Sequence, residues 1–353
     1  MKKKALYFCA GRSSFVENDL QILSDEFEIK VFVFRPQSSP DTIWVYARQF
    51  FFILSNIFSA DILVCFFASH HSLLPAFFGK LFRKPCVIVM GGTDCVSFPS
   101  IGYGNFSKKG LRMVTKLTYK WAAILLPVHK SLIECDYTYQ DKDYNKQGFL
   151  YFCPGLKTPY QEINFGFDPA KWDVSMQKVP NSFITVAAGL ENPYRVALKG
   201  VDLILGAAES FPNAHFTVIG FPDDYKFTNK PKNLTTYPYV SNDRLKELYG
   251  KNEFYLQVSI SEGFPNAICE AMMCGCIPIG SNVGAIPDIV GDTGFILEKR
   301  DIGKFKEILS RAIDCDKPAF SNKARQRIIT NYPKDLRKNQ LLPLLTKLTG
   351  KSS

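Results

Sequence analysis

Residues 259–290, SISEGFPNAICEAMMCGCIPIGSNVGAIPDIV, carry two carboxylates eight positions apart, Glu262 and Glu270. The run EFYLQVSI that leads into this segment is apolar and predicts a buried strand. A helix is predicted over 266–274, with Pro265 at its first position, where a missing N–H costs nothing. A strand, a tight loop and a helix in this order predict one unit of an α/β fold.

The same alternation of short apolar runs and longer helical segments extends along the whole chain. Because βαβ units of this kind build parallel sheets, the order predicts an α/β protein with two such sheets. The first series of strands is ALYFC, IKVFVF, DILVCFF, PCVIVM and AILLPV, and the second is SFITVAA, HFTVIG, NLTTYPYV, EFYLQVSI and CIPIGS. Two such domains are expected to face a central cleft at the carboxyl ends of their strands.

A polar stretch that lacks clear periodicity separates the two series, at 165–182. It suits a connection between domains. We therefore predict an acceptor-side domain at 1–168, a linker at 169–182, a second domain at 183–330 and a helical segment at 331–353.

Composition restricts the class of protein. The 353 residues are 46% hydrophobic and 22% charged, which suits two soluble domains. The ten cysteines lack a CxxC pair and mostly lie in apolar runs, so we interpret them as reduced core residues. The short apolar run after MKKK fits a first strand better than a signal peptide, and no run reaches the roughly 18 apolar residues of a membrane span. A cytoplasmic protein is expected.

The net charge of +10 predicts an anionic partner, which could be nucleic acid, a phosphorylated substrate or an acidic membrane surface. The basic residues are spread evenly over both halves of the chain. Because nucleic-acid-binding proteins concentrate them in one footprint, we expect no nucleic-acid partner.

The loop at Glu262 combines an anion site with a carboxylate. Free N–H groups at a helix start bind anions, phosphates above all. A carboxylate beside them would repel a phosphate, unless it accepts hydrogen bonds from neutral hydroxyls of the same ligand. Glu262 and Glu270 on either side of such a site therefore suggest a nucleotide-sugar. The alternative is a helix-capping acid and a solvated surface residue.

The longer segment SEGFPNAICEAMMCGCIPIGSNVGAIPDIVGDTGFIL, 261–297, resembles the donor-binding motif of the GT-B retaining glycosyltransferases of family 4, glycosyl transferases group 1, with their E-x7-E pair. The resemblance implies two Rossmann-like domains. It implies that Glu262 holds hydroxyls of the transferred sugar and that Glu270 holds the ribose. It also implies that the loop between them faces sugar and phosphate, through Gly263, Phe264, Pro265 and Asn266.

Two further segments are similar to parts of that family. GLENPYRVALKGVDLILGAA, 189–208, resembles the segment whose basic pair, here Arg195 and Lys199, grips the donor diphosphate and stabilises the leaving group. VIVMGGTDC, 87–95, resembles a turn in which many relatives carry histidine before Gly-Thr-Asp, whereas this chain has Gly91. Asp94 is a catalytic candidate on the acceptor side. The alternatives are a solvated basic pair and a turn-forming Asp.

Weaker candidates lie near the other strand ends of the first domain. Gly11 and Arg12, in CAGRSS, stand where relatives have a phosphate loop. His70, His71 and His129 follow predicted strands, and we expect capping or loop roles for them rather than catalysis.

The reaction that the resemblance implies is transfer of a sugar from a nucleoside-diphosphate donor to an acceptor hydroxyl, with retention of anomeric configuration. Because a basic pair at Arg195 and Lys199 makes a divalent ion unnecessary, neither a metal nor a cofactor other than the donor is expected. The expected acceptor is a glycan or a lipid-linked glycan of the cell surface. The alternatives are a nucleotide-sugar epimerase and a catalytically idle sugar-nucleotide-binding protein of the same architecture.

A stripe of cations in NFSKKGLRMVTKLTYKWAAILL recurs every four residues, at Lys108, Arg112, Lys116 and Lys120. On a helix these residues fall on one side. They predict either an ordinary solvated face or a peripheral contact with an anionic membrane. The aromatic run 44–54, WVYARQFFFIL, is predicted to be a buried helix.

Overall fold

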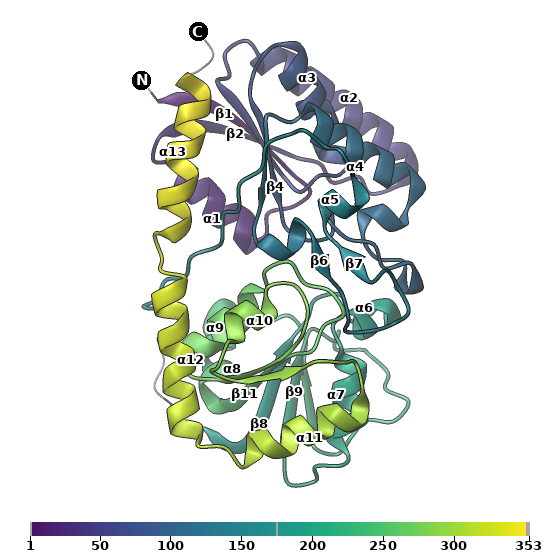
Figure 1. The fold of residues 1–353 in the computed structure, drawn as a ribbon, viewed down its shortest axis with the longest axis vertical. Helices are drawn as coiled ribbons and strands as arrows, with labels where there is room; N and C mark the ends of the chain where they lie inside the picture. Colours follow the sequence, from purple (N-terminus) through teal and green to yellow (C-terminus); the bar gives the residue numbers. More distant parts are fainter. Residues whose placement is uncertain (1, 174–175, 351–353) are drawn as a thin grey trace. The chain divides into compact units, whose positions relative to one another are not determined.

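The computed structural model describes residues 2–173 and 176–350 and divides the chain into two compact units (Figure 1). Unit 1 comprises residues 1–136, 146–165 and 336–353, and unit 2 comprises residues 137–145 and 166–335. Because their relative placement is not determined, each unit is described separately.

Unit 1 contains a parallel sheet of five strands in the order β2-β1-β3-β4-β5. Strands β3, β4 and β5 are buried along their whole length, as expected of a parallel sheet that helices cover on both faces. The strands are β1 (Lys3–Cys9), β2 (Phe27–Val33), β3 (Ile62–Phe66), β4 (Cys86–Met90) and β5 (Ile124–Pro127).

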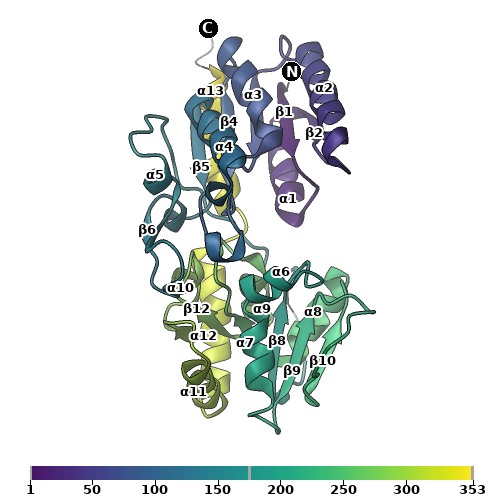
Figure 2. The same ribbon diagram turned by 90° about the vertical axis from the view of Figure 1, so that its right-hand side faces the viewer.

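The helices of unit 1 cover both faces of this sheet. Helices α2, α3 and α4 lie side by side on one face, and α1 and α13 lie together on the other (Figures 1 and 2). Their bounds are α1 (Ser14–Leu23), α2 (Ser39–Asn56), α3 (His70–Leu81), α4 (Lys109–Trp121), α5 (Phe149–Phe152) and α13 (Leu336–Gly350). Three 3-10 turns, at Pro99–Ile101, Asn105–Ser107 and Lys130–Leu132, and an antiparallel pair, β6 (Cys135–Asp136) and β7 (Lys146–Gln147), complete the described elements.

Unit 2 contains a parallel sheet of six strands in the order β10-β9-β8-β11-β12-β13. The strands are β8 (Val179–Val186), β9 (His215–Ile219), β10 (Leu234–Tyr237), β11 (Asn252–Gln257), β12 (Ile277–Ser281) and β13 (Phe295–Leu297). The helices are α6 (Pro193–Leu198), α7 (Val201–Ala208), α8 (Asn242–Lys251), α9 (Asn266–Met273), α10 (Ile286–Val290), α11 (Ile302–Ile313) and α12 (Lys317–Asn331). Helices α8, α9 and α12 pack together on one face, and α7 packs with α11 on the other.

The domain limits differ from those drawn on the sequence in three places. Residues 137–145, inside the predicted domain 1–168, belong to unit 2. Strand β8 begins at Val179, inside the predicted linker 169–182. The predicted helical segment 331–353 contains α13, which belongs to unit 1, although the residues that precede it belong to unit 2.

A buried ion pair holds α13 in unit 1. Arg337 Nε donates to Asp19 Oδ1 at 2.5 Å, and Arg337 Nη2 donates to Asp19 Oδ2 at 2.8 Å. Arg337 Nη1 donates to the carbonyl of Ile163, and the guanidinium lies 4.7 Å from the centre of the Phe165 ring. Bidentate pairing of this kind satisfies the hydrogen-bond donors of the buried guanidinium and fixes the helix in one position.

The aromatic run 44–54 is helical, but the prediction that it is buried is wrong in part. Within α2, Val45 and Ile53 are buried, whereas Trp44 and Phe51 are exposed. A helix packed on a sheet buries one side only, so apolar residues all around α2 leave some in water. No helix in the described part of the chain is long and apolar enough to cross a membrane.

Candidate functional site

The sheet of unit 2 reverses its strand order between β8 and β11. The connection after β8 leads to β9 on one side, and the connection after β11 leads to β12 on the other side. The two connections therefore part at the carboxyl ends of β8 and β11, which pair with each other. Open α/β sheets bind ligands at such a reversal.

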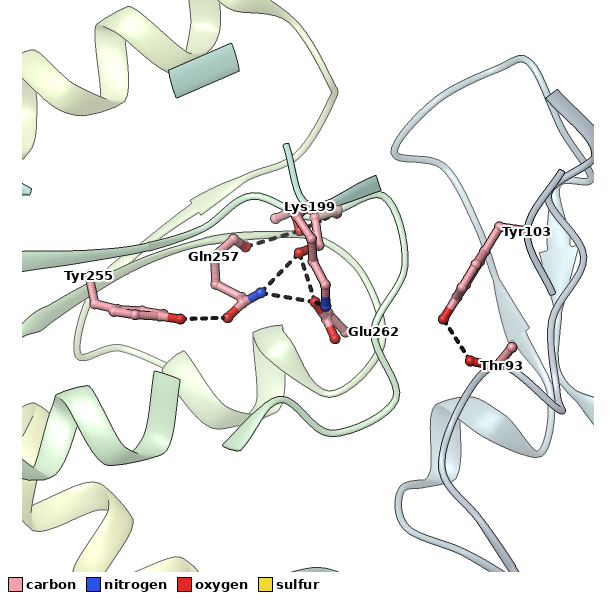
Figure 3. A network of polar contacts seen from close by, with 8 residues as sticks. Thr93, Tyr103, Lys199, Tyr255, Gln257 and Glu262 are labelled. Atoms are coloured by element: carbon pink, nitrogen blue, oxygen red, sulfur yellow. Dashed lines mark hydrogen bonds and ion pairs between the residues drawn. The ribbon is translucent and has the colours of Figure 1, made fainter. Parts of the chain in front are cut away.

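Glu262 lies in the connection that follows β11 and is held by three hydrogen bonds (Figure 3). Its Oε1 accepts from Lys199 Nζ at 2.7 Å, from Gln257 Nε2 at 2.9 Å and from Ser259 Oγ at 2.8 Å. Among the described residues, Oε2 has no hydrogen-bond partner. One oxygen therefore fixes the carboxylate, and the other is available to accept from a ligand.

Lys199 reaches Glu262 because the connection after β8 packs tightly on the end of β11. Ile260 N donates to the carbonyl of Leu198 at 2.8 Å. Gly200 has a φ of +68°, and a Cβ there would lie 2.1 Å from the carbonyl oxygen of Val258. Only glycine permits this close approach. Lys199 lies between Leu198 and Gly200 in the chain, so these two close contacts hold its backbone in place.

Polar groups on β11, its extension and β12 form a chain of hydrogen bonds that supports Glu262. Tyr255 donates its hydroxyl to Gln257 Oε1 at 3.1 Å, and Ser281 Oγ donates to the carbonyl of Ser259 at 2.7 Å. Tyr255, Gln257 and Ser259 alternate along the chain and therefore share one side of the strand and its extension. Gln257 and Ser259 are not among the residues predicted from the sequence, although this alternation of polar residues at a strand end is a signal that identifies them.

Helix α9 begins directly after the loop of Glu262. Pro265 is its N-cap residue, and no side chain caps its first turn. The buried Oδ1 of Asn266 has no partner among the described residues. The loop is fixed by the bond from Ala285 N to the carbonyl of Gly263, at 3.1 Å. The first turn of α9 thus offers uncapped amides beside Glu262.

Phe264 has a different role from its neighbours in the loop. Its side chain is buried against the rings of Phe167 and Tyr332. It therefore anchors the loop of Glu262 to unit 2 through its side chain.

Glu270 lies one turn further along α9. Burial raises the pKa of its carboxyl to about 7, and Lys171 lowers it slightly. Within the described chain, no hydrogen bond reaches this carboxylate. A buried acid without a partner holds its proton to higher pH, because the charged form lacks solvation. A ligand hydroxyl would supply the missing donor.

Arg195 lies in α6, one turn before Lys199. Its Nε contacts the hydroxyl of Tyr194 at 3.2 Å, and its guanidinium lies 5.8 Å from the centre of that ring. Among the described residues it forms no ion pair. The structure thus brings Lys199, Glu262 and the start of α9 together at one edge of one sheet, with Arg195 one turn before Lys199 along the chain.

The expectation that Asp94 serves as a catalytic residue needs correction. Asp94 is completely buried in unit 1, and burial raises its pKa to about 6. Its carboxylate accepts from the backbone N–H groups of Ala68, at 2.9 Å, Gly92, at 3.2 Å, and Gly91, at 3.3 Å. Asp94 thus ties the loop after β4 to the loop after β3, and its carboxylate is fully occupied by these backbone donors and has no exposure in this structure.

Gly91 faces the ring of Phe67 in unit 1. A Cβ at Gly91 would lie 2.0 Å from Phe67 Cε1. Phe67 itself has a φ of 70°, which is uncommon for a residue with a bulky side chain. The ring of Phe67 therefore occupies the space that a side chain at position 91 would need, which explains why this position holds glycine.

The remaining candidates of unit 1 have structural partners. Arg12 pairs with Glu17 at 2.7 Å in an exposed contact, and a Cβ at Gly11 would meet no atom within 4 Å. His70 opens α3 and its Nδ1 lies 3.0 Å from the Tyr46 hydroxyl.

The other two histidines also bond to nearby groups of unit 1. His71 is buried, burial lowers its pKa to about 4, and its Nε2 lies 2.7 Å from the carbonyl of Phe66. His129 accepts from Ser131 N and caps a 3-10 turn.

The ten cysteines are free thiols, and eight of them are buried. In the described ranges, His, Cys, Asp and Glu side chains form no group of three or more that could hold a metal ion.

Comparisons with known proteins cover the part of the chain that holds Lys199 and Glu262. Residues 195–335 match the family model for glycosyl transferases group 1. The chain is 25% identical over 141 residues to a serotype-specific mannosyltransferase of Escherichia coli, which covers 40% of this chain and 15% of that protein. It is 34% identical over 105 residues to an alpha-galactosylglucosyldiacylglycerol synthase of Streptococcus pneumoniae, which covers 27% of each. The chain thus spans less than a third of the length of these relatives.

The fold is shared along the whole chain with solved structures. The structure of Anabaena Alr3699/HepE in complex with UDP-glucose superposes with a TM-score of 0.75 and 15% identity, over 98% of this chain and 99% of that chain. The predicted fold class, two Rossmann-like domains of the GT-B type, is therefore confirmed. Residues 195–335, the part of the chain that is similar to the glycosyl transferases group 1, include both Lys199 and Glu262.

Proposed function

We propose that the protein transfers a sugar from a nucleoside-diphosphate-sugar to an acceptor hydroxyl, with retention of anomeric configuration and without a metal ion. The observation that carries the proposal is the pair of Lys199 and Glu262 beside the uncapped start of α9, at the strand reversal of unit 2. This edge offers cations and amides for a diphosphate and carboxylates for hydroxyls.

The donor has a defined place in this proposal. A hydroxyl of the transferred sugar donates to Glu262 Oε2, and a ribose hydroxyl donates to Glu270. The diphosphate lies between them, on the backbone amides of Gly263, Phe264 and Asn266 at the start of α9. Arg195 and Lys199 approach the same phosphates from α6 and the turn that follows it.

The reaction then requires little covalent chemistry from the protein. The bond between the anomeric carbon and the leaving phosphate oxygen breaks, and a bond to the acceptor oxygen forms on the same face of the sugar. The acceptor proton ends on the departing diphosphate. Arg195 and Lys199 stabilise the negative charge that grows on this diphosphate, and they are in place before the reaction begins.

The cationic pair supports metal independence, because two fixed cations supply the charge that a divalent ion would otherwise provide. The expected result is that EDTA leaves the transfer rate unchanged. Activity that EDTA abolishes and that magnesium or manganese restores would contradict this part of the proposal.

The names of the relatives support an acceptor of the cell surface, either a glycan or a lipid-linked glycan. We propose a cytoplasmic location with peripheral contact to an anionic membrane. Of the stripe predicted on α4 and its N-cap, Lys108, Lys116 and Lys120 are exposed, whereas Arg112 donates to the carbonyl of Phe106, so the four cations do not form one continuous exposed row.

A thermal-shift panel of nucleotide-sugars tests the proposal, because a ligand that binds only the folded state raises the melting temperature. The best donor is then incubated with the protein and a set of candidate glycan or glycolipid acceptors, and the products are analysed. A transferase releases the nucleoside diphosphate. An epimerase would instead return an isomeric nucleotide-sugar, and an idle binding protein would consume nothing. No melting-temperature change with any member would refute the donor site.

A further inference from the structure

The outer side of α2 exposes large apolar side chains to solvent. Ile43 and Trp44 are each 72% exposed, Phe51 is 65% exposed, and Phe58, just past the helix end, is 73% exposed. Trp44 and Phe51 stand seven positions, or about two turns, apart and therefore lie on the same side of the helix. A row of exposed rings along a helix of 18 residues marks an interaction surface.

Ring contacts extend this apolar face to the last turns of α3 and α4. The Phe58 ring lies 5.2 Å from the Phe82 ring, which directly follows α3. The Phe77 ring lies 5.4 Å from the Trp121 ring at the end of α4. Leu81, between Phe77 and Phe82 in the chain, is 58% exposed. The exposed surface is thus continuous over three neighbouring helices of one unit.

A basic pocket of about 340 Å³ opens beside this apolar face. Four cations line it, namely Lys80, Arg83, Lys84 and Lys120, and none of them forms an ion pair with a described residue. No acidic residue lines it in the described chain. The remaining lining residues are Gly79, Pro85, Cys86, Trp121, Ala122, Ala123 and Leu348.

The pocket is separate from the candidate donor site. It lies at the amino end of β4 and at the ends of α3 and α4 in unit 1. Ligands of parallel sheets bind at the opposite, carboxyl ends of the strands. The cluster of cations at the amino end therefore has no role in the proposed reaction and needs its own explanation.

We propose that this face of unit 1 docks on an anionic lipid membrane, with a lipid phosphate in the pocket and the exposed rings of α2 in the interfacial layer. Trp and other amphipathic rings favour this layer. Basic side chains that meet anionic headgroups strengthen the binding of such surfaces. Four unpaired cations beside a row of exposed rings complement a membrane both in charge and in polarity.

Other occupants explain only half of the surface. A free phosphate would fill the pocket but leave Trp44, Phe51 and Phe58 in water. A protein partner or a second copy of the chain would cover the rings, but the pocket would then require an acidic group from that partner. Only a surface that joins phosphates to an apolar layer matches both features over the area of three helices.

This inference rests on the membrane contact of the proposed function and gives it a defined surface. It assigns the membrane contact to the face formed by α2 and the basic pocket, in place of the stripe along α4. Only Lys120 belongs to both. The two surfaces can therefore be separated by substitution.

Co-sedimentation of the full chain with vesicles tests the assignment. The vesicles contain phosphatidylcholine alone or phosphatidylcholine mixed with phosphatidylglycerol. Wild type is expected to bind the mixed vesicles only. The variant Lys80→Gln/Lys84→Gln/Lys120→Gln should bind them about 100-fold more weakly. The variant Trp44→Ser/Phe51→Ser/Phe58→Ser should also lose binding, because it removes the rings that enter the interfacial layer. These side chains are exposed, so their replacement should leave the core intact.

A matched control removes three charges elsewhere on unit 1. Lys108→Gln/Lys109→Gln/Lys116→Gln changes exposed lysines of α4 and its N-cap that do not line the pocket, and should bind the vesicles almost as wild type does. If both lysine variants lost vesicle binding equally, the assignment of a lipid phosphate to the pocket would be overturned, and the binding would be unspecific electrostatic attraction. A melting temperature that rises with inorganic phosphate, without vesicle binding, would also overturn it.

Two further readouts separate the remaining outcomes. Sedimentation velocity without vesicles detects self-association, and a dimer that the serine variant dissociates would reassign the face to a second copy. The nucleotide-sugar thermal shift is repeated on every variant. A variant that loses vesicle binding but keeps its melting-temperature response to the donor shows that the substitution affects this surface alone. If wild type shows no melting-temperature response to any donor, the proposed function is refuted.

Discussion

Lys199 Nζ lies 2.7 Å from Glu262 Oε1, although 63 positions separate the two residues in the chain. The contact joins the connection after β8 to the connection after β11, at the point where the sheet of unit 2 reverses its strand order. Both side chains are mostly buried, so the ion pair is shielded from solvent more than a surface pair would be. The ion pair sets the position of both groups before a ligand arrives.

We expect Arg195→Ala and Lys199→Ala each to lower the transfer rate by a factor on the order of 100 or more, as for other fixed groups that stabilise a developing charge. Steady-state kinetics with the donor chosen by the panel measures this. Arg244→Ala is the matched control in unit 2, since Arg244 pairs with Glu247 on the surface. Rates that fall equally in Arg244→Ala would count against a specific role of the pair.

The two glutamates should respond differently to substitution. Glu262→Ala should lower kcat, because it removes a contact that positions the transferred sugar, whereas Glu270→Ala should mainly raise KM through weaker nucleotide binding. Both constants are obtained from the same initial-rate series. Unchanged kinetics in both variants would remove the two carboxylates from the donor site.

Donor binding should depend on pH through Glu270. Its raised pKa of about 7 means that the carboxyl is largely protonated below that pH, whereas ribose hydroxyls donate to the ionised form. Donor affinity in wild type should therefore fall as pH drops below about 7, and affinity in Glu270→Gln should vary much less. Titration calorimetry at pH 6 and pH 8 compares the two proteins, and parallel curves would contradict the assignment.

The same shift predicts the stability of the protein without donor. A carboxyl whose folded pKa is about 7, above the usual 4.5, favours folding at low pH and loses that advantage as pH rises from about 4.5 to 7. At pH 8, Glu270→Gln should therefore exceed wild type in free energy of unfolding, by a difference on the order of 3 kcal/mol. At pH 4.5 the difference should be small. Urea unfolding at both pH values measures it.

The packing of Phe67 on Gly91 predicts a stability change in unit 1. Gly91→Ala places a Cβ 2.0 Å from Phe67 Cε1 and should lower the free energy of unfolding by about 1–3 kcal/mol, as expected of an overpacked core. Gly91→Ala/Phe67→Gly should recover most of this loss, since it removes the ring and relieves the backbone of position 67. A double variant less stable than Gly91→Ala would show that the ring is not the cause.

The buried pair of Asp19 and Arg337 should be costly to break. Arg337→Met leaves the Asp19 carboxylate buried without its partner, and we expect a loss of about 3–5 kcal/mol in free energy of unfolding. Asp19→Leu/Arg337→Met removes both charges and should be closer to wild type. Limited proteolysis near α13 provides a second readout, because a loosened helix is cleaved faster.

The sequence predicted the parallel strands and the helix after Glu262 well, because buried apolar runs and a proline at a helix start are local signals. It missed Gln257 and Ser259, whose role depends on a carboxylate that the fold brings beside them. The burial of Asp94 was missed for a related reason, since its partners include the backbone N–H of Ala68, 26 positions away.

Long-range features of unit 1 also lay beyond the sequence. The return of α13 to unit 1 depends on Arg337 and Asp19, which stand 318 positions apart. The run 44–54 is apolar on all sides, so its pattern could not tell which side a sheet would cover. Exposure of Trp44 and Phe51 follows only from the packing of α2.

The most direct test of the donor site is calorimetric titration of the panel's best nucleotide-sugar into wild type, Lys199→Ala, Glu270→Ala and the control Arg244→Ala. The proposed site predicts saturable one-to-one binding to wild type and to Arg244→Ala. It predicts binding weakened by a factor on the order of 100 in Lys199→Ala, which loses a charged contact to the diphosphate, and clearly weakened in Glu270→Ala. Equal affinity for all four proteins would show that the donor binds elsewhere and would contradict the account.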